Sequence, residues 1–167
     1  YSLGDNRKGT ATIRQEIDNT TSYLELMKLR YEHRLDYEIS CEEEMAGLEV
    51  PRLILQPFVE NVFEHVYSLE HRKVLVTVKG YCEGNSYRLI IGDDGQGMKE
   101  ADADRLMEEI GNSCRNRKLG GNGNGTGKIG IQNTMLRLTL YFKERFSYKK
   151  ETAEGEGFLV QLSFEKG

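Results

Sequence analysis

The residues with the clearest chemical use are Asp93 and Asp94, which follow an apolar run and precede Gly95, Gln96 and Gly97. Glycine adopts backbone conformations that other residues rarely reach, and it lets a flat ligand approach the main chain closely. A carboxylate beside such glycines can accept a hydrogen bond from an exocyclic amine, such as the amine of adenine. An ordinary turn after a strand is the alternative interpretation, and this stretch alone does not decide between the two.

A second glycine-rich stretch runs from Gly125 to Gly130 and reads G-T-G-K-I-G. No strand pattern precedes it, which argues against a dinucleotide-binding loop, and Ile129 stands where a P-loop requires Ser or Thr. Glycines at the start of a helix still present free N–H groups at the positive end of the helix dipole, which suits a phosphate. Lys128 would add a positive charge to such a site.

The third stretch, Pro51 to Val66, is predicted to form one helix. Apolar residues at three- and four-residue steps indicate a buried stripe, made of Leu55, Phe58, Val59, Val62 and Val66. The other side carries Glu60, Asn61, Glu64 and His65, either as a solvated face or as a site. The amide oxygen of Asn61 could bind a magnesium ion that also binds phosphates. Together the three stretches predict a nucleotide site with three walls.

The remaining pattern predicts the elements that hold these stretches in place. Helices are expected at 11–31, 51–66, 100–110 and 128–142, and strands at 35–41, 74–78, 87–91, 145–151 and 157–165. Thr10 or Thr12 can cap the first helix. Pro51 suits a first helical turn, whereas Pro57 should kink the helix or mark its true start. This order predicts an α+β sandwich, in which helices cover one face of a mixed sheet.

Two connecting segments stand out by composition. Residues 42–47 are predicted to form an acidic loop. Residues 111–127 contain six glycines, four asparagines and the basic residues Arg115, Arg117 and Lys118. A loop of this length in a compact domain is usually a lid or a disordered segment.

Composition limits the classes of function. The chain has 167 residues and 19.1 kDa, which suits one domain with an appended element. A net charge of −4 gives no electrostatic reason to expect a nucleic-acid partner, and no apolar run is long enough to span a membrane. The three cysteines lack the spacing of a disulfide framework or a zinc site, so reduced cytosolic thiols are expected. The chain begins at Tyr1, without an initiator Met, and we expect it to be a piece of a longer protein.

Three motifs resemble those of the sensor histidine kinases. L-Q-P-F-V-E-N-V-F-E-H resembles their N-box, D-D-G-Q-G their G1 box, and G-T-G-K-I-G-I-Q-N-T-M-L-R-L their G2 box. The L-Q-P-x-V-E-N form, with Y-L-E-L-M-K-L-R-Y-E-H-R-L before it, is similar to the LytS/YesM-type branch. The resemblance covers nearly the whole chain.

This resemblance implies the Bergerat (GHKL) fold, a two-layer α+β sandwich with a long ATP lid, and ATP and Mg²⁺ as the bound cofactors. It implies that Asn61 binds the magnesium ion and acts in catalysis together with His65 and Glu60. The residues expected at the nucleotide are Asp93, Gly95, Gly97, Met98, Gly125, Gly127, Lys128, Gly130 and Ile131. Residues 1–34 would be the remnant of, and linker from, a dimerisation and phospho-acceptor region, and residues 35–167 the catalytic domain.

The implied function is to hold ATP so that its γ-phosphate faces a histidine on a separate helical domain, absent from this chain. The expected partners are that phospho-acceptor domain of the same protein and a response regulator, with a homodimer in the full-length protein. No nucleic acid and no direct membrane contact are expected. The chain would be the cytoplasmic domain of a sensor protein in the plasma membrane, and it would be inactive alone because it lacks the acceptor histidine.

Two alternatives remain open at this stage. A GHKL hydrolase would need a glutamate one helical turn before Asn61 to activate water, but Pro57 occupies that position and Glu60 is rotated about 100° away. A degenerate, non-catalytic nucleotide scaffold is the other, because Glu64 stands where many relatives carry a lysine and Asp94 where they carry an asparagine.

Overall fold

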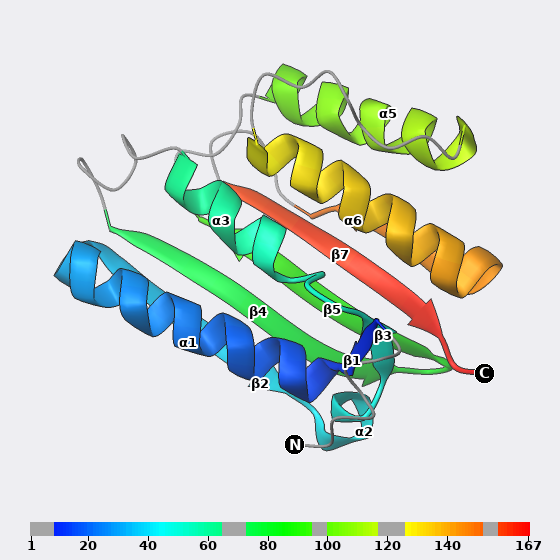
Figure 1. Ribbon diagram of the computed structural model, residues 1–167, viewed down its shortest axis with the longest axis horizontal. Helices are drawn as coiled ribbons and strands as arrows, with labels where there is room; N and C mark the ends of the chain where they lie inside the picture. The colour runs from blue at the N-terminus through cyan, green and yellow to red at the C-terminus, as the bar shows by residue number, and fades with distance from the viewer. Residues whose placement is uncertain (1–8, 65–72, 95–99, 117–125, 152–156) are drawn as a thin grey trace.

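The computed structural model describes residues 9–64, 73–94, 100–116, 126–151 and 157–167. Within these ranges a five-stranded sheet has the order β2-β4-β5-β7-β6, and helices cover one of its faces (Figure 1). The strands are β2 (Leu35–Cys41), β4 (Val74–Glu83), β5 (Ser86–Asp93), β6 (Phe146–Lys150) and β7 (Phe158–Glu165). Strands β2 and β4 are parallel, and the other neighbouring pairs are antiparallel. The sheet is therefore mixed, as predicted.

The helices fill the second layer. They are α1 (Ile13–Tyr31), α2 (Glu43–Ala46), α3 (Gln56–Glu64), α5 (Glu100–Asn116) and α6 (Thr126–Phe142), with short 3₁₀ turns at Glu32–Arg34 and Lys143–Arg145. A small antiparallel pair, β1 (Thr10–Thr12) with β3 (Glu49–Pro51), joins the start of α1 to the segment before α3. The sequence analysis missed this pair because each strand has only three residues.

Alternation along the strands separates the two faces of the sheet. Val74, Val76 and Val78 of β4 are fully buried beneath the helices, and every second residue of β5 and β7 continues this apolar surface. The same core includes Ile13, Leu24 and Tyr31 of α1. Helix α1 thus packs on the sheet formed by residues 35–165, while the predicted boundary at residue 34 stays a prediction.

Local chemistry explains where α1 begins. The Thr12 hydroxyl accepts a hydrogen bond from the Gln15 N–H at 3.2 Å, and the Gln15 side chain accepts one from the Thr12 N–H at 2.9 Å. This reciprocal capping box satisfies two N–H groups that the first turn leaves unpaired. Of the two predicted caps, Thr12 is the one that the fold uses.

The prediction of one helix from Pro51 to Val66 was wrong at its start. Pro51 ends β3, and α3 begins only at Gln56, so Pro57 lies in the first turn, where proline loses no intrahelical hydrogen bond. Residues 42–47 are also not a plain loop, because Glu43–Ala46 form the short helix α2.

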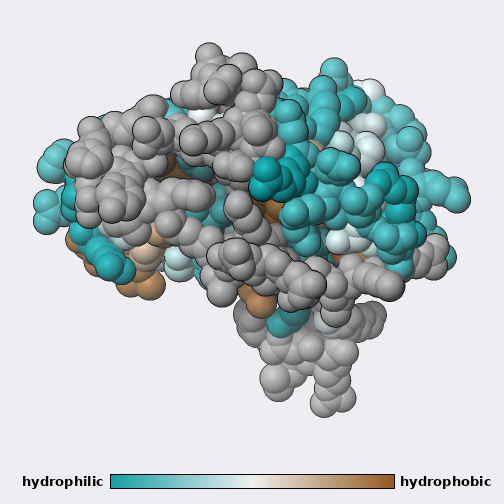
Figure 2. Space-filling model, turned by 90° about the horizontal axis from the view of Figure 1, so that it is seen from above, coloured by the Kyte–Doolittle hydropathy of each residue, from teal (hydrophilic) through white to brown (hydrophobic). Residues whose placement is uncertain are grey.

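The predicted lid 111–127 begins later than expected. Helix α5 continues to Asn116, and α6 already starts at Thr126, so only 117–125 remain between them, outside the described residues. Leu106 and Ile110 of α5 are buried, and its opposite side is charged. Seen from above this helix, the described surface is mainly hydrophilic (Figure 2).

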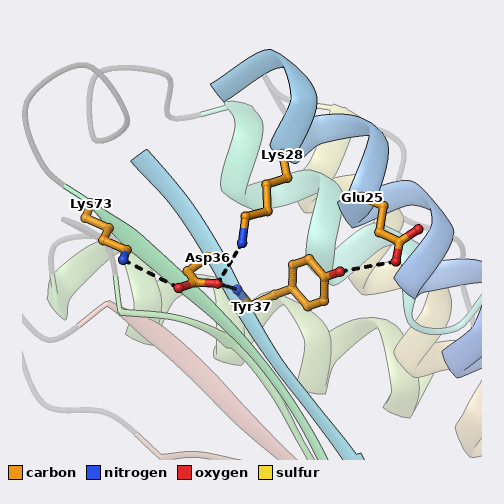
Figure 3. A network of polar contacts seen from close by, with 5 residues as sticks. All are labelled: Glu25, Lys28, Asp36, Tyr37 and Lys73. Carbon is orange, nitrogen blue, oxygen red and sulfur yellow. Dashed lines mark hydrogen bonds and ion pairs between the residues drawn. The ribbon is translucent and has the colours of Figure 1, made fainter. Parts of the chain in front are cut away.

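A polar network fixes the edge of the sheet at β2 (Figure 3). The Asp36 carboxylate contacts the Lys28 ammonium of α1 at 3.1 Å and the Lys73 ammonium, just before β4, at 3.4 Å. It also accepts the Tyr37 N–H at 3.0 Å, and the Tyr37 hydroxyl reaches Glu25 at 3.5 Å. The contacts of Asp36 with Lys28, the Tyr37 N–H and Lys73 lower the pKa of this carboxyl, chiefly through the hydrogen bond from Lys28. The network ties α1 to the first two strands of the sheet.

Among the helices of the described residues, none is long and apolar enough to cross a membrane.

Candidate nucleotide site

Helix α3 carries the first wall of the site. Its apolar stripe packs into the core, with Phe58, Val59 and Val62 nearly fully buried and Leu55, just before the helix, fully buried. The helix contacts both β5 and α6. Asn61 is also buried, at 2% exposure, and its Oδ1 atom has no hydrogen-bond partner among the described residues. Buried polar atoms are almost always paired, so this oxygen is an exception that needs an explanation.

The end of β5 carries the second wall. Asp93 pairs in register with Val76 of β4 and Phe158 of β7, and its side chain is only 7% exposed. It shares the helix-facing side of the sheet with the buried Ile91 and Val76. An acidic side chain on this otherwise apolar surface is suited to a specific polar contact rather than to packing.

Two glycines make the end of β5 possible. A Cβ atom on Gly92 would lie 2.0 Å from the Phe158 carbonyl oxygen, and one on Gly157 would lie 2.0 Å from the Asp93 carbonyl oxygen. No side chain fits at either position, and Gly157 also has a φ of +90°. The sequence analysis assigned the close approach to the main chain to Gly95 and Gly97. It missed Gly92 and Gly157, because the sequence does not show how close β7 lies to the end of β5.

Asp94 has a structural partner. Its carboxylate accepts a hydrogen bond from the Leu75 N–H at 2.7 Å, and its own N–H donates to the Leu75 carbonyl at 3.1 Å. These bonds fasten the end of β5 to the start of β4. An asparagine at this position would also have an oxygen that could accept the first bond. The negative charge of Asp94, the second acid after Asp93, therefore points to the main chain of β4.

The start of α6 carries the third wall. The N-terminus of α6 lies at the same end of the molecule as α3 and the end of β5 (Figure 1). Gly127 and Lys128 lie in its first turn, so the positive end of the helix dipole faces this region. A Cβ atom on Gly130 would lie 3.2 Å from Pro57 Cβ, so Gly130 lets α6 approach α3 closely. Ile131 is fully buried in the core. The nucleotide roles of all four stay predictions.

Glu60 lies on the solvent side of α3. It is exposed and accepts a hydrogen bond from the Gln56 side chain at 3.3 Å. The pKa of Tyr23 in α1 is raised by burial and, after that, by the charge of Glu60. Glu60 therefore faces α1, while the next residue, Asn61, is turned into the interior. Its catalytic role stays a prediction.

Several predicted site residues cannot be placed. His65, Gly95, Gly97, Met98 and Gly125 lie outside the described residues, as do the side chains of Glu64 and Lys128. Within the described part of the chain, no group of three or more His, Cys, Asp or Glu side chains is arranged to hold a metal ion. A magnesium ion needs few protein ligands when phosphates supply the others. The unpaired oxygen of Asn61 fits that demand.

Residues 48–166 match the family described as "Histidine kinase-, DNA gyrase B-, and HSP90-like ATPase", which is more than half of the chain. The chain belongs to this family. The resemblance that the motifs predicted is thereby confirmed.

The curated relatives are sensor kinases. "Sensor histidine kinase/phosphatase LytS" of Staphylococcus aureus (strain MRSA252) is 26% identical over 167 residues, which cover 99% of this chain and 27% of that protein. "Sensor histidine kinase YesM" of Bacillus subtilis (strain 168) is 24% identical over 157 residues, covering 94% of this chain and 24% of that protein. The chain spans about a quarter of the length of these relatives.

Solved structures confirm the fold class. The "catalytic domain of histidine kinase ThkA" aligns with a TM-score of 0.63 at 12% identity, covering 94% of this chain and 96% of that one. The histidine kinase domain from the Erythrobacter litoralis EL346 blue-light activated kinase aligns with a TM-score of 0.59 at 15% identity, covering 95% and 64%. The chain has the α+β fold of a histidine kinase catalytic domain.

Proposed function

We propose that this chain is the ATP-binding catalytic part of a two-component sensor histidine kinase, and that it presents the γ-phosphate of ATP to a histidine on a separate helical domain. The observation that carries the proposal is the Asn61 amide oxygen, which is buried at 2% exposure without a partner among the described residues. A fold does not keep such an atom unpaired without cause, and a nucleotide-bound cation supplies the missing partner.

Each wall of the site has a separate task. The carboxylate of Asp93 accepts a hydrogen bond from the adenine amine, which favours adenine over guanine. The first turn of α6 offers N–H groups to the phosphates. Asn61 would hold Mg²⁺, which neutralises phosphate charge when bound. The chain itself then contributes positioning rather than covalent chemistry, as in other phosphoryl transfers.

The proposed partners follow from the family. The phosphate acceptor is a histidine on a helical domain of the same protein, and a response regulator receives the phosphate afterwards. The chain works as the cytoplasmic part of a membrane sensor that dimerises through its helical region. Because the acceptor histidine is missing, the chain alone would not autophosphorylate.

A GHKL hydrolase is the second candidate, and the packing of Pro57 weighs against it. A water-activating base would have to stand one helical turn before Asn61, where Pro57 is packed against Gly130 instead. Glu60, the acid next to Asn61 in the sequence, faces α1. The scaffold alternative loses one of its two grounds, because the Asp94 carboxylate accepts a hydrogen bond from the main chain of β4.

The test mixes this chain with Mg-ATP and a separate fragment that carries the acceptor helices, and it measures acid-labile phosphate on the fragment. We expect phosphate on the fragment, none on the chain alone, and none when Asn61→Ala replaces the parent. Release of inorganic phosphate without labelling of the fragment would support the hydrolase. Binding of ATP with neither reaction would support the scaffold.

A further inference from the structure

A buried acid anchors the segment that leads into α3. Glu16 of α1 is 2% exposed and lies on the same side of its helix as Ile13, Thr20 and Leu24. Its two carboxylate oxygens accept hydrogen bonds from the Leu53 N–H at 2.8 Å and the Ile54 N–H at 3.2 Å. A helix from a different part of the chain thus supplies the acceptor for the turn that precedes α3.

The anchored turn is constrained from other sides as well. Leu53 has a φ of +58°, a conformation that a leucine rarely adopts without support. The Arg52 carbonyl accepts a hydrogen bond from the Arg137 guanidinium of α6, and the Arg52 side chain donates to the Thr10 carbonyl at 3.0 Å. The charge of Arg137 also acts on Glu16. Helices α1 and α6 together hold this turn in one conformation.

Helix α1 also contacts α3 itself, beyond Asn61 in the sequence. The Phe63 ring stacks on Tyr31 with centroids 5.5 Å apart, and it meets Tyr23 edge to face at 5.8 Å. Contacts from α1 therefore lie both before and after Asn61 in the sequence. Figure 1 shows the two helices side by side over the sheet.

We infer that Glu16 is a positioning residue for the nucleotide site, which fixes the start of α3 and thereby the place of the Asn61 amide oxygen. The inference rests on the proposed function, since it assumes that Asn61 meets nucleotide-bound Mg²⁺. The role resembles that of residues behind a metal ligand, which orient the ligand without touching the metal. Burial raises the pKa of Glu16, opposed by the hydrogen bonds from Leu53, Ile54 and Leu55, so ionisation of this side chain works against stability. If Glu16 served stability alone, a neutral side chain at this position would give the more stable fold.

The experiment separates position from stability with Glu16→Gln. Glutamine keeps the shape, but its amide N–H₂ would face a backbone N–H. Titration calorimetry measures ATP affinity with Mg²⁺ and with EDTA, and the ratio is the magnesium-dependent gain. We expect this gain to fall about tenfold in Glu16→Gln, as for residues behind a metal ligand. Adenosine affinity should stay near that of the parent, while the unfolding midpoint should fall, because one of the two N–H groups loses its acceptor. Glu25→Gln is the matched control, an exposed acid on the same helix.

A second variant and a spectroscopic readout complete the test. Glu16→Asp keeps the charge but shortens the reach, and we expect an intermediate loss of the gain. Amide signals of Leu53 and Ile54 and the side-chain signal of Asn61 should shift together in both variants.

The outcomes separate this inference from the proposed function. A parent chain without magnesium-dependent ATP binding overturns the proposed function. A parent that binds in an Asn61-dependent way, with an unchanged gain in Glu16→Gln, overturns only the inference. The inference is also overturned if the affinities for adenosine and for ATP, with or without Mg²⁺, fall equally. Failure of both variants to fold has the same consequence, because Glu16 would then serve stability alone.

Discussion

Glu16 and Asn61 are equally buried polar side chains, each at 2% exposure, yet their surroundings are opposite. Both oxygens of Glu16 accept hydrogen bonds from the turn before α3, whereas the Asn61 oxygen has no partner among the described residues. The two lie on neighbouring helices, α1 and α3. The fold therefore satisfies one buried acceptor completely and leaves the other unsatisfied.

We propose that the difference separates the polar group that holds the fold together from the one that meets a ligand. A satisfied buried group makes its region rigid, and an unsatisfied one costs free energy until something binds. Sites of function are where a sequence departs from local consistency. The two residues should accordingly respond in opposite ways to substitution.

The largest effect is expected for the stability of Glu16→Ala. The substitution leaves the Leu53 and Ile54 N–H groups without their acceptor, and each such group costs about 1–3 kcal/mol, partly recovered if water enters. We expect a loss of about 2–4 kcal/mol in the free energy of unfolding. Urea denaturation followed by circular dichroism measures it. Glu25→Ala should change stability by less than about 0.5 kcal/mol, and an equal loss there would contradict the comparison.

Asn61→Ala should show the reverse pattern. Stability should stay the same or rise, because the variant removes a buried acceptor that has no partner among the described residues. The magnesium-dependent gain in ATP affinity should fall at least about tenfold, with adenosine binding retained. Calorimetry with and without EDTA measures the gain. A large loss of stability with normal magnesium dependence would show that Asn61 is structural.

Asp93→Asn tests the other wall of the site. An amide presents its N–H₂ group where the adenine amine needs an acceptor, unless the side chain flips. Loss of one charge-assisted hydrogen bond weakens binding about tenfold or more. ATP and adenosine should be affected alike, in contrast to Asn61→Ala. The adenine assignment fails if calorimetry gives unchanged affinity for a folded variant.

The pH dependence of stability sharpens the same contrast. The pKa of Glu16 lies above its ordinary value of 4.5 because of burial. Its stabilising contribution is thus complete below pH 4.5 and is lost as the pH rises through the folded-state pKa. Glu16→Gln should lack this decline, so parent and variant should converge at high pH or cross. Denaturant titrations from pH 4 to pH 8 measure the difference, and Glu25→Gln should keep the slope of the parent.

The smallest effect is expected at the exposed network of Asp36. The hydrogen bond from Lys28 lowers the pKa of this carboxyl below its ordinary value of 3.8. Its contribution is present above pH 3.8 and is lost as the pH falls through the folded-state pKa, the opposite direction from Glu16. Asp36→Asn should remove this acid-side decline. Glu38→Gln, exposed on the same strand, is the control, and an equal change there would mean that the network contributes nothing of its own.

Much of the fold could be predicted because it depends on local periodicity. The alternation in β2, β4 and β7 and the helical spacing of α1 and α6 place those elements within a few residues. Errors occurred where two principles competed. Pro51 suits a helix start as well as a strand end, and here it ends a strand. The glycine and asparagine content of 111–116 favours a loop, but these residues continue helix α5, which is stabilised by packing of the residues before them.

The sequence by itself determined the family and the mixed α+β architecture, and it predicted the three walls of the proposed site, because motif spacing and hydrophobic periodicity are properties of neighbouring residues. Only the tertiary structure decided that Asp94 bonds to β4, that Gly130 makes room for Pro57, and that Glu16 anchors the turn before α3. Each of these contacts joins residues at least 19 positions apart in the chain. Which groups meet there depends on how the helices and strands pack, and a carboxylate reads the same in the sequence whether it ends in water, against a backbone N–H or beside a ligand.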